Sequence, residues 1–210
     1  MASVRRVGPT RRRLDARDSR KGFIHCYGLF WSVDEVWPEG ERGAPFRLLG
    51  KLGQRAPGLQ VCDFRDQRGI YVLYDEYGPH YVGLTREQPL GNRLADHRRD
   101  KHAKKWDRFS WFGFKPVRVR CLLDGTHALG ELPLRRNMEA RSTIGDVEAL
   151  LIQALGTRHR GNAVNMRFAS ADNWTQVKAA DAVALIARLP KPTPSRAVPS
   201  PRIRRTRASR

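Results

Sequence analysis

Two short apolar runs joined by a turn signal constrain the fold of this chain more than any other feature of its sequence. The first run reads GIYVLY over residues 69–74, and the second reads HYVGLT over residues 80–85. The first run has the period of two that is typical of a strand with one buried face. Residues 75–79, DEYGP, have the composition of a turn. The sequence therefore predicts a β-hairpin with a five-residue loop.

The relative placement of two tyrosines depends on the length of that loop. Because side chains alternate between the faces of a strand, Tyr71 and Tyr81 share a face only if the loop has an odd number of residues. A loop of about five residues pairs Tyr74 with His80 and meets this condition. Gly83 then lies across from Tyr71, where the missing side chain leaves room for the backbone of a ligand. We therefore expect both tyrosines in one site, with Gly83 as a nucleic-acid contact.

The hairpin is followed by a segment that predicts a helix over residues 92–106. Arg93 and His97 are four residues apart, so they share one face of this helix. Three lysines continue the stripe: Lys101, Lys104 and Lys105. We expect these lysines to contact the phosphates of a nucleic acid. The competing interpretation is a solvated basic face.

Further elements are expected on both sides of this region. Residues 22–66 begin with an aromatic and β-branched stretch, which predicts a β-rich extension. Core cover, substrate discrimination and dimer contact are all open as its role. Strands are also expected over 109–114 and 117–123. The apolar spacing over 145–156 predicts a helix that ends at a glycine, and a last helix is predicted over 171–189.

The charge of the chain indicates the kind of partner that it binds. The 210 residues include 40 Lys and Arg against 21 Asp and Glu, a net charge of +19. Such an excess favours a polyanion, because cations neutralise phosphates and release counterions. We expect nucleic acid, with an anionic membrane or another acidic partner as the alternative. Residues 1–21 predict a flexible basic arm, and residues 190–210, rich in Pro, Ser and Arg, predict a disordered tail.

The cysteines and the apolar stretches bear on the compartment. Cys26, Cys62 and Cys121 are odd in number and lie far apart, without the spacing of metal ligands. They argue against a disulfide framework and against a structural zinc site, and we expect free thiols in a reducing cytoplasm. No apolar stretch approaches the roughly 20 residues that span a bilayer. The N-terminus lacks the apolar segment of a secretory signal. The sequence therefore predicts a cytoplasmic protein with no membrane partner.

Several of these residues suit the hydrolysis of a phosphodiester bond. The reaction needs a base for the attacking water, positive charge for the phosphorane and help for the leaving oxygen. Arg93 is always charged and can bind a phosphate through two hydrogen bonds. Tyr71 could act as the base if a nearby cation lowers the pKa of its hydroxyl from about 10. A buried carboxylate can hold one Mg²⁺ whose other ligands are water and phosphate.

The order of the motifs resembles that of the GIY-YIG endonuclease family. The likeness covers roughly residues 67–168 and rests on GIY at 69–71, YVG at 81–83, the helix with Arg93, and Glu148 in EALLIQAL. The second triplet has Val82 where the family has isoleucine. The resemblance implies an α/β (α+β) fold with a small central three-stranded antiparallel sheet flanked by helices. It places a nuclease domain over 67–170, between the N-terminal extension and the C-terminal helix.

The resemblance also implies roles for the residues of the hairpin and the following helix. Tyr71 matches the tyrosine that acts as the general base on water. Tyr81 matches a supporting tyrosine that donates a hydrogen bond or relays a proton. Arg93 matches the arginine that stabilises the charge of the transition state. His97 falls one helical turn later, where the family often has a His or Lys near the attacking water.

Two further matches lie in the second half of the chain. Glu148 matches the glutamate that binds the single divalent metal ion, Mg²⁺ or Mn²⁺. Asn162 matches a late asparagine that supports the site, and Asn165 fits nearly as well. Each residue also has an ordinary structural interpretation. The tyrosines could be strand aromatics that pack across a pair, and Glu148 could simply favour the N-terminus of its helix.

The sequence therefore predicts a metal-dependent endonuclease that acts on DNA, expected to be duplex. A homodimer is expected if the enzyme cuts both strands. The first alternative is a nucleic-acid-binding protein on the same scaffold without catalysis. A further alternative is an RNA-binding or ribosome-associated basic protein, suggested by the arginine-rich ends. No helix-turn-helix or zinc-finger motif is present in the sequence to predict a DNA sequence preference.

Overall fold

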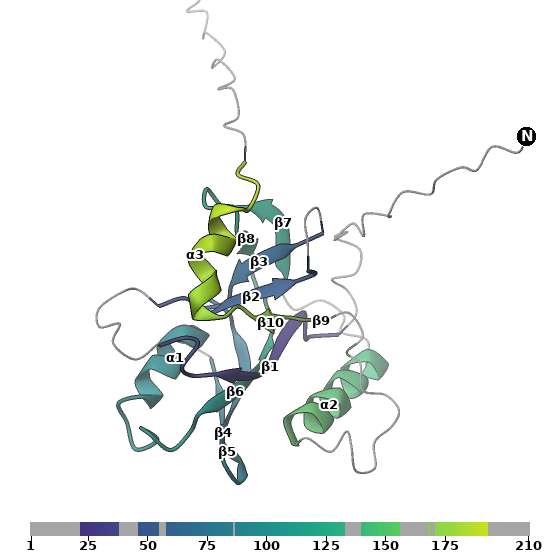
Figure 1. Ribbon diagram of the computed structural model, residues 1–210. Helices are drawn as coiled ribbons and strands as arrows, with labels where there is room; N and C mark the ends of the chain where they lie inside the picture. Colours follow the sequence, from purple (N-terminus) through teal and green to yellow (C-terminus); the bar gives the residue numbers. More distant parts are fainter. Residues whose placement is uncertain are drawn as a thin grey trace, which may run out of the picture.

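The computed structural model describes residues 22–37, 46–54, 58–85, 87–132, 140–155, 168 and 171–192 (Figure 1). In these ranges the chain forms two five-stranded sheets and three helices. The first sheet has the strand order β5-β4-β6-β1-β9. Its strands are β5 (Gly78–Leu84), β4 (Gly69–Asp75), β6 (Arg108–Gly113), β1 (Cys26–Ser32) and β9 (Asp172–Asn173). The pair β1 and β9 is parallel, and the other pairs are antiparallel.

The prediction of a central sheet with three strands is wrong, because the sheet has five. Strands β4 and β5 pair as the predicted hairpin and β6 pairs with β4, but β1 adds to β6 with Cys26 opposite Gly113, and β9 adds to β1. The aromatic side chains of β1 and β6 explain why the sheet continues. Trp31 on β1 packs edge-on against Trp111 on β6, with ring centroids 5.3 Å apart, and both are almost fully buried. A strand that buries tryptophan needs a neighbour on its own sheet as well as a covering layer.

The second sheet has the order β10-β2-β3-β8-β7. Its strands are β10 (Thr175–Gln176), β2 (Leu49–Leu52), β3 (Gln60–Asp63), β8 (His127–Leu129) and β7 (Val117–Cys121). The pair β3 and β8 is parallel. Helix α3 (Ala179–Ala187) contributes Ala182, Leu185 and Ile186 to a small cluster with Leu49 and Val61 of this sheet. The strand predicted over 117–123 is therefore present, but it belongs to a sheet that the prediction did not include.

The helix predicted over 171–189 begins later than expected. Residues 172–176 form the short strands β9 and β10, and α3 starts at Ala179. Trp174 lies between the two strands, is buried, and its backbone N–H donates to the carbonyl of Tyr27. Its ring packs against Phe64, with centroids 5.1 Å apart. Because Trp174 is held in the core between the two sheets, the chain around it is extended instead of helical.

Helices α1 (Leu90–His97) and α2 (Ala140–Leu155) cover opposite faces of the first sheet, as Figure 1 shows. Leu90 and Leu94 of α1 belong to the core cluster that contains Tyr71 and Leu73. Ala149 and Ala154 of α2 belong to a separate cluster that contains Val72 and Tyr74. Since neighbouring residues of a strand point to opposite faces, the two clusters lie on the two sides of β4. The site described below lies on the α1 side.

Candidate functional site

A β-bulge in the hairpin brings the two tyrosines to one face. Asp75 pairs with Gly78 and Tyr74 with Pro79, so the turn has two residues instead of the expected five. The register then shifts, and Leu73 pairs with Tyr81. An even loop alone would place Tyr71 and Tyr81 on opposite faces. The extra residue of the bulge, His80, restores the shared face that the sequence predicted.

Tyr71 and Tyr81 lie next to each other across β4 and β5, with ring centroids 6.2 Å apart. Gly83 pairs directly with Tyr71. A Cβ atom on Gly83 would lie 2.2 Å from Cζ and from the hydroxyl oxygen of Tyr71. The space beside this glycine is therefore filled by the ring of Tyr71. The expected room for the backbone of a ligand is already occupied.

The hydroxyl group of Tyr71 is the centre of a buried hydrogen-bond network. It lies 2.7 Å from Nε2 of His97, and Arg93 and Tyr81 also hydrogen-bond to it. On the other side of the imidazole ring, Nδ1 of His97 lies 2.7 Å from Oδ2 of Asp100. Tyr71 is completely buried and His97 is 2% exposed. The structure thus brings together four of the predicted site residues and adds Asp100 to them.

The hydrogen bonds determine the tautomer of a neutral His97. Hydrogen bonds from the backbone of His102 and from His97 lower the pKa of Asp100, although desolvation opposes them. Asp100 is therefore ionised at neutral pH and can only accept. Nδ1 of His97 consequently carries the hydrogen and donates it to Asp100, while Nε2 accepts from the Tyr71 hydroxyl. This Tyr–His–Asp order makes His97 a potential acceptor for the Tyr71 proton.

Burial and the charge of Arg93 have opposite effects on the pKa of the Tyr71 hydroxyl. Desolvation, the largest effect, raises the pKa of its hydroxyl, the charge and hydrogen bond of Arg93 lower it, and Tyr81 raises it; the net pKa is about 12. The hydroxyl is therefore protonated at neutral pH. Arg93 is the group that stabilises the tyrosinate when the proton leaves, because its positive charge lies beside the oxygen. The side chain of Arg93 is 32% exposed, so it also has access to solvent.

Two further histidines extend the cluster, and the sequence did not single them out. Nε2 of His80 lies 3.1 Å from Nδ1 of His102, and Nδ1 of His80 lies 3.4 Å from Oδ2 of Asp75. The His102 ring packs on Tyr81, with centroids 4.6 Å apart. The signal that could have found His102 is the His-x-x-Asp-x-His spacing of residues 97–102. The signal for His80 is absent from the sequence, because it depends on the bulge.

Helix α1 ends at His97, nine residues before the predicted end. The side chain of Asp100 explains the early end. Its Oδ1 accepts from the backbone N–H of His102 at 2.7 Å, while its Oδ2 binds the His97 ring. Such local side-chain bonds compete with the helical hydrogen bonds of the backbone. Lys104 then adopts a positive φ of 61°, which no α-helix contains.

The predicted lysine stripe is therefore a basic loop and not a helix face. Lys101, Lys104 and Lys105 are all exposed on the loop that connects α1 to β6. Arg98 and Arg99, also exposed, precede them in the same loop. Arg98 stacks over Trp37, with its guanidinium carbon 4.7 Å from the ring centroid. The loop presents positive charge next to the cluster of Tyr81, Arg93 and His102.

For the two remaining predicted site residues, Glu148 and Asn162, the structure describes no side chain. Glu148 belongs to α2, which packs on the sheet face opposite Tyr71, and its side chain is not among those that the structure describes. Asn162, and Asn165 as its alternative, also lie outside the described residues. Helix α2, which carries Glu148, contributes Ala149 and Ala154 to the cluster on the sheet face opposite Tyr71.

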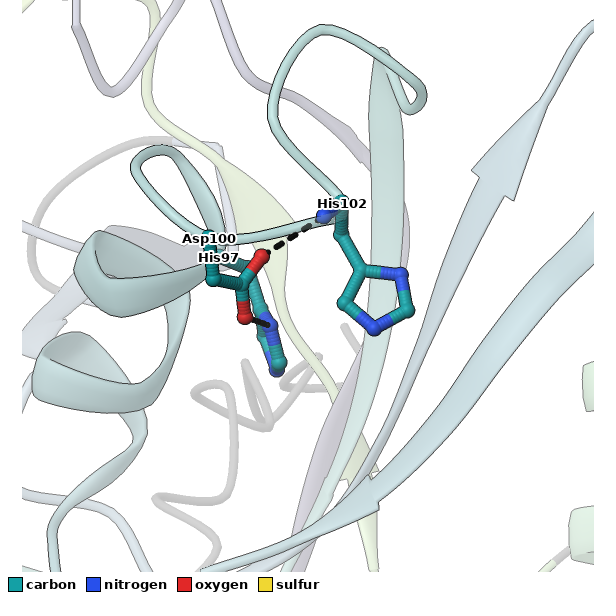
Figure 2. Close-up of side chains that lie close together, drawn as sticks. All are labelled: His97, Asp100 and His102. Atoms are coloured by element: carbon teal, nitrogen blue, oxygen red, sulfur yellow. Dashed lines mark hydrogen bonds and ion pairs between the residues drawn. The ribbon is translucent and has the colours of Figure 1, made fainter.

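A different set of metal-binding atoms lies on the Tyr71 side. His97, Asp100 and His102 each offer one donor atom, and these atoms lie within 4.8 Å of one another (Figure 2). Within the residues that the structure describes, this is the one group of three His, Cys, Asp or Glu side chains with such spacing. Its two nitrogen donors distinguish it from the oxygen sites that Mg²⁺ prefers.

The three cysteines are free. Cys26 and Cys62 are buried free thiols, and Cys121 is a half-buried one. In the described parts of the chain, no helix has both the length and the apolar character needed to cross a bilayer.

Comparison with models of protein families, with curated proteins and with solved structures finds no match for this chain.

Proposed function

We propose that this protein is an endonuclease that hydrolyses phosphodiester bonds in DNA. One observation carries the proposal: the Tyr71 hydroxyl is shared between an arginine that can bind phosphate and the His97–Asp100 pair that can accept a proton. A nuclease needs these two capacities close together, a base and a cation beside the reacting phosphorus. The resemblance of the GIY and YVG motifs to the GIY-YIG nucleases supports the same activity.

The residues suggest a route for the proton of the attacking water. Tyr81 is partly exposed and hydrogen-bonds to Tyr71, whose hydroxyl is in turn hydrogen-bonded to Nε2 of His97. The proton of the water would pass to Tyr81 as the Tyr81 proton moves to Tyr71 and the Tyr71 proton moves to Nε2. Asp100 then stabilises the imidazolium that forms. This route explains how a fully buried tyrosine can take part in a surface reaction.

Arg93 supplies the positive charge in this proposal. Its guanidinium group hydrogen-bonds to Tyr71 and remains partly exposed, so one side can stabilise the tyrosinate and the other can contact a phosphate oxygen. Asp96 lies 4.0 Å from Nη1 of Arg93 and is itself exposed. The basic loop that follows α1 provides further charge for the DNA backbone. Phosphate contacts of this kind position DNA without selecting its sequence.

The requirement for a divalent ion is part of the proposal, and Glu148 remains the predicted holder of Mg²⁺ or Mn²⁺. A carboxylate on a helix suits these hard cations, and a bound ion polarises the phosphoryl group and stabilises the leaving oxygen. Because α2 packs on the opposite face of the sheet from Tyr71, the assignment needs a direct test. Glu148→Ala with Glu76→Ala as its matched control provides one, since Glu76 is exposed in the hairpin turn.

The test is cleavage of supercoiled plasmid DNA by the full chain with Mg²⁺ or Mn²⁺. We expect nicked or linear product, a loss of about 100-fold or more for Tyr71→Phe and Arg93→Ala, and no cleavage for Glu148→Ala. Tyr77→Phe is the control for Tyr71→Phe, because Tyr77 is 90% exposed at the hairpin tip. Cleavage that is unchanged in Tyr71→Phe and Arg93→Ala would reject this mechanism.

A second candidate is a nucleic-acid-binding protein without catalysis. The complete burial of Tyr71 and the near-complete burial of His97 favour it, because neither side chain reaches solvent in this conformation. In that case the two residues would hold the hairpin against α1. Binding of duplex DNA that weakens steeply with salt, together with no cleavage under any divalent ion, would support this function over the nuclease.

A further inference from the structure

We propose that His97, Asp100 and His102 form a binding site for one divalent first-row transition-metal ion of the Zn²⁺ class. Nothing in this inference depends on nuclease activity, and the ion is distinct from the Mg²⁺ assigned to Glu148. Figure 2 shows the Asp100 carboxylate against both other residues, with one oxygen toward the His97 ring and one toward the backbone of His102. All three donor atoms lie within 4.8 Å of one another.

The identity of the donors determines the class of ion. Two imidazoles and one carboxylate are typical ligands of Zn²⁺ and of other late first-row ions, and an open fourth position is common for such sets. Mg²⁺ and Ca²⁺ prefer sites made of oxygen atoms alone. The thiols do not add to this set, since Cys26 and Cys62 belong to the core cluster between the sheets and Cys121 lies on β7.

The present spacing is close to that of a loaded site. Nδ1 of His97 and Oδ2 of Asp100 are 2.7 Å apart and share a hydrogen. Two ligands of a tetrahedral Zn²⁺ ion with bonds of about 2.0 Å lie ~3.3 Å apart. An ion would therefore replace the shared hydrogen after a separation of the two atoms by roughly half an ångström. Asp100 is on an exposed loop, so a small rotation of its side chain supplies this movement.

Hydrogen bonds from neighbouring residues orient His97, the first of the three proposed ligands, as in known metal sites. A histidine that binds a metal through one nitrogen usually donates a hydrogen bond from the other nitrogen. With an ion at Nδ1, the hydrogen of His97 would lie on Nε2, which is 2.7 Å from the Tyr71 oxygen. The metal-bound His97 would then not accept the Tyr71 proton, so the ion would block the proton route of the proposed nuclease. The indole Nε1 of the buried Trp106 donates to the backbone carbonyl of His97 at 3.4 Å and holds the end of α1 in place.

The second imidazole is also held from outside the set. Nδ1 of His102 contacts Nε2 of His80, whose other nitrogen faces the carboxylate of Asp75. Asp75 thus contacts His80, and His80 contacts the proposed metal ligand His102. The backbone N–H of His102 donates to Asp100, which fixes the spacing between the last two ligands. The loop is therefore preorganised by contacts on both sides of the three donors.

Isothermal titration of the full chain, purified without a histidine tag and stripped of metal with EDTA, tests the proposal with Zn²⁺ as the probe and no DNA present. We expect one high-affinity Zn²⁺ ion per chain. Asp100→Asn and His102→Ala should each weaken binding at least tenfold, and neither removes a buried side chain. The controls are Asp107→Asn and His127→Ala, which change an exposed aspartate and a histidine on β8, and Cys121→Ser; all three should bind as the wild type does.

Affinity that is equal in the wild type, Asp100→Asn and His102→Ala would overturn the site, as would the lack of a stoichiometric Zn²⁺ ion in the wild type. A visible spectrum of the Co²⁺-loaded protein provides a second readout, because nitrogen and oxygen ligands in tetrahedral geometry give absorption bands that free Co²⁺ lacks. Circular dichroism of each variant checks that its fold is retained. Since no step of this test measures cleavage, its failure would leave the proposed nuclease activity standing, and the reverse also holds.

Discussion

The hydroxyl oxygen of Tyr71, on β4, lies 2.7 Å from Nε2 of His97, the last residue of α1. Both side chains are buried, so this hydrogen bond joins the strand and the helix inside the core. A buried hydrogen-bonding atom that loses its partner costs about 1–3 kcal/mol. The contact therefore has a structural role whether or not Tyr71 takes part in catalysis.

Tyr71→Phe should lower the free energy of unfolding by about 1–2 kcal/mol, because Nε2 of His97 then has no donor from the strand. The ring itself remains and keeps its packing. Urea denaturation followed by tryptophan fluorescence measures the change, and Tyr77→Phe at the exposed hairpin tip should leave the midpoint unchanged. Equal stability of the two variants would show that the hydrogen bond has no net effect.

Gly83→Ala should destabilise the protein by roughly 2–3 kcal/mol. The new methyl group would lie 2.2 Å from Cζ and from the hydroxyl oxygen of Tyr71, a fully buried side chain in the same core cluster as Leu94 of α1. Val82→Ala, one residue away on the opposite face, is the control, since Val82 is 62% exposed and its change should cost under about 1 kcal/mol. The same urea titration compares them. A Gly83→Ala protein as stable as Val82→Ala would contradict the arrangement of the hairpin.

Arg93→Lys should retain less than about one tenth of the wild-type cleavage rate. Lysine keeps the positive charge, but it cannot bind Tyr71 and a phosphate oxygen at once as the planar guanidinium group does. Plasmid cleavage at saturating DNA measures the rate. Arg188→Lys, an exposed position at the end of α3, should cleave like the wild type. Full activity in Arg93→Lys would show that only the positive charge of this residue is needed, and not the two-sided hydrogen bonding of its guanidinium group.

Replacement of Lys101, Lys104 and Lys105 by alanine should weaken DNA binding and flatten its salt dependence. Each phosphate contact that is lost lowers the slope of log K against log salt by about 0.9. Fluorescence anisotropy with one labelled duplex across several salt concentrations gives both quantities. Lys191→Ala, beyond α3, is the control. An unchanged slope in the triple variant would place the DNA on another surface.

The stability of the protein should fall in acid as Asp124 becomes protonated. Desolvation alone would raise its pKa, but hydrogen bonds from Thr126 and Arg47 outweigh this effect and lower the pKa to about 2. Because the folded pKa is below the ordinary value of 3.8, the stabilisation is complete above about pH 4. It is lost as the pH falls through about 2.

Asp124→Asn checks this assignment through the pH dependence of the unfolding midpoint. At pH 7 it should cost about 1–2 kcal/mol, since the contact with Arg47 at 2.7 Å is partly exposed. Near pH 2 the difference from the wild type should nearly vanish. Asp66→Asn, at an exposed position, should show no such dependence. A difference that stays constant from pH 7 to pH 2 would assign the effect to something other than the charge of Asp124.

The sequence predicted the parts of the site that depend on local patterns. Alternation and turn composition gave strands at β4 and β5, and the i, i+4 spacing gave the pairing of Arg93 with His97 on one helix face. The shared face of Tyr71 and Tyr81 was also expected, although for a different reason. A five-residue loop was predicted, whereas a two-residue turn followed by a bulge at His80 produces the same parity. Turn composition does not distinguish these two solutions.

Contacts between distant residues decided the rest. The pairing of β1 with β6 and β9 joins residues some 80 and 145 positions apart and turns a three-stranded prediction into a five-stranded sheet. The Asp100 side chain ended α1 early and placed His102 beside His97, which helical periodicity could not show. The face of the sheet that α2 covers, away from Tyr71, likewise depends on where Ala149 and Ala154 find apolar partners. The sequence by itself thus determined which segments are strands and which side chains alternate together, because those preferences are local. Only the tertiary structure decided which strands are neighbours and which side chains meet, because burial of the tryptophan core depends on residues far apart in the chain.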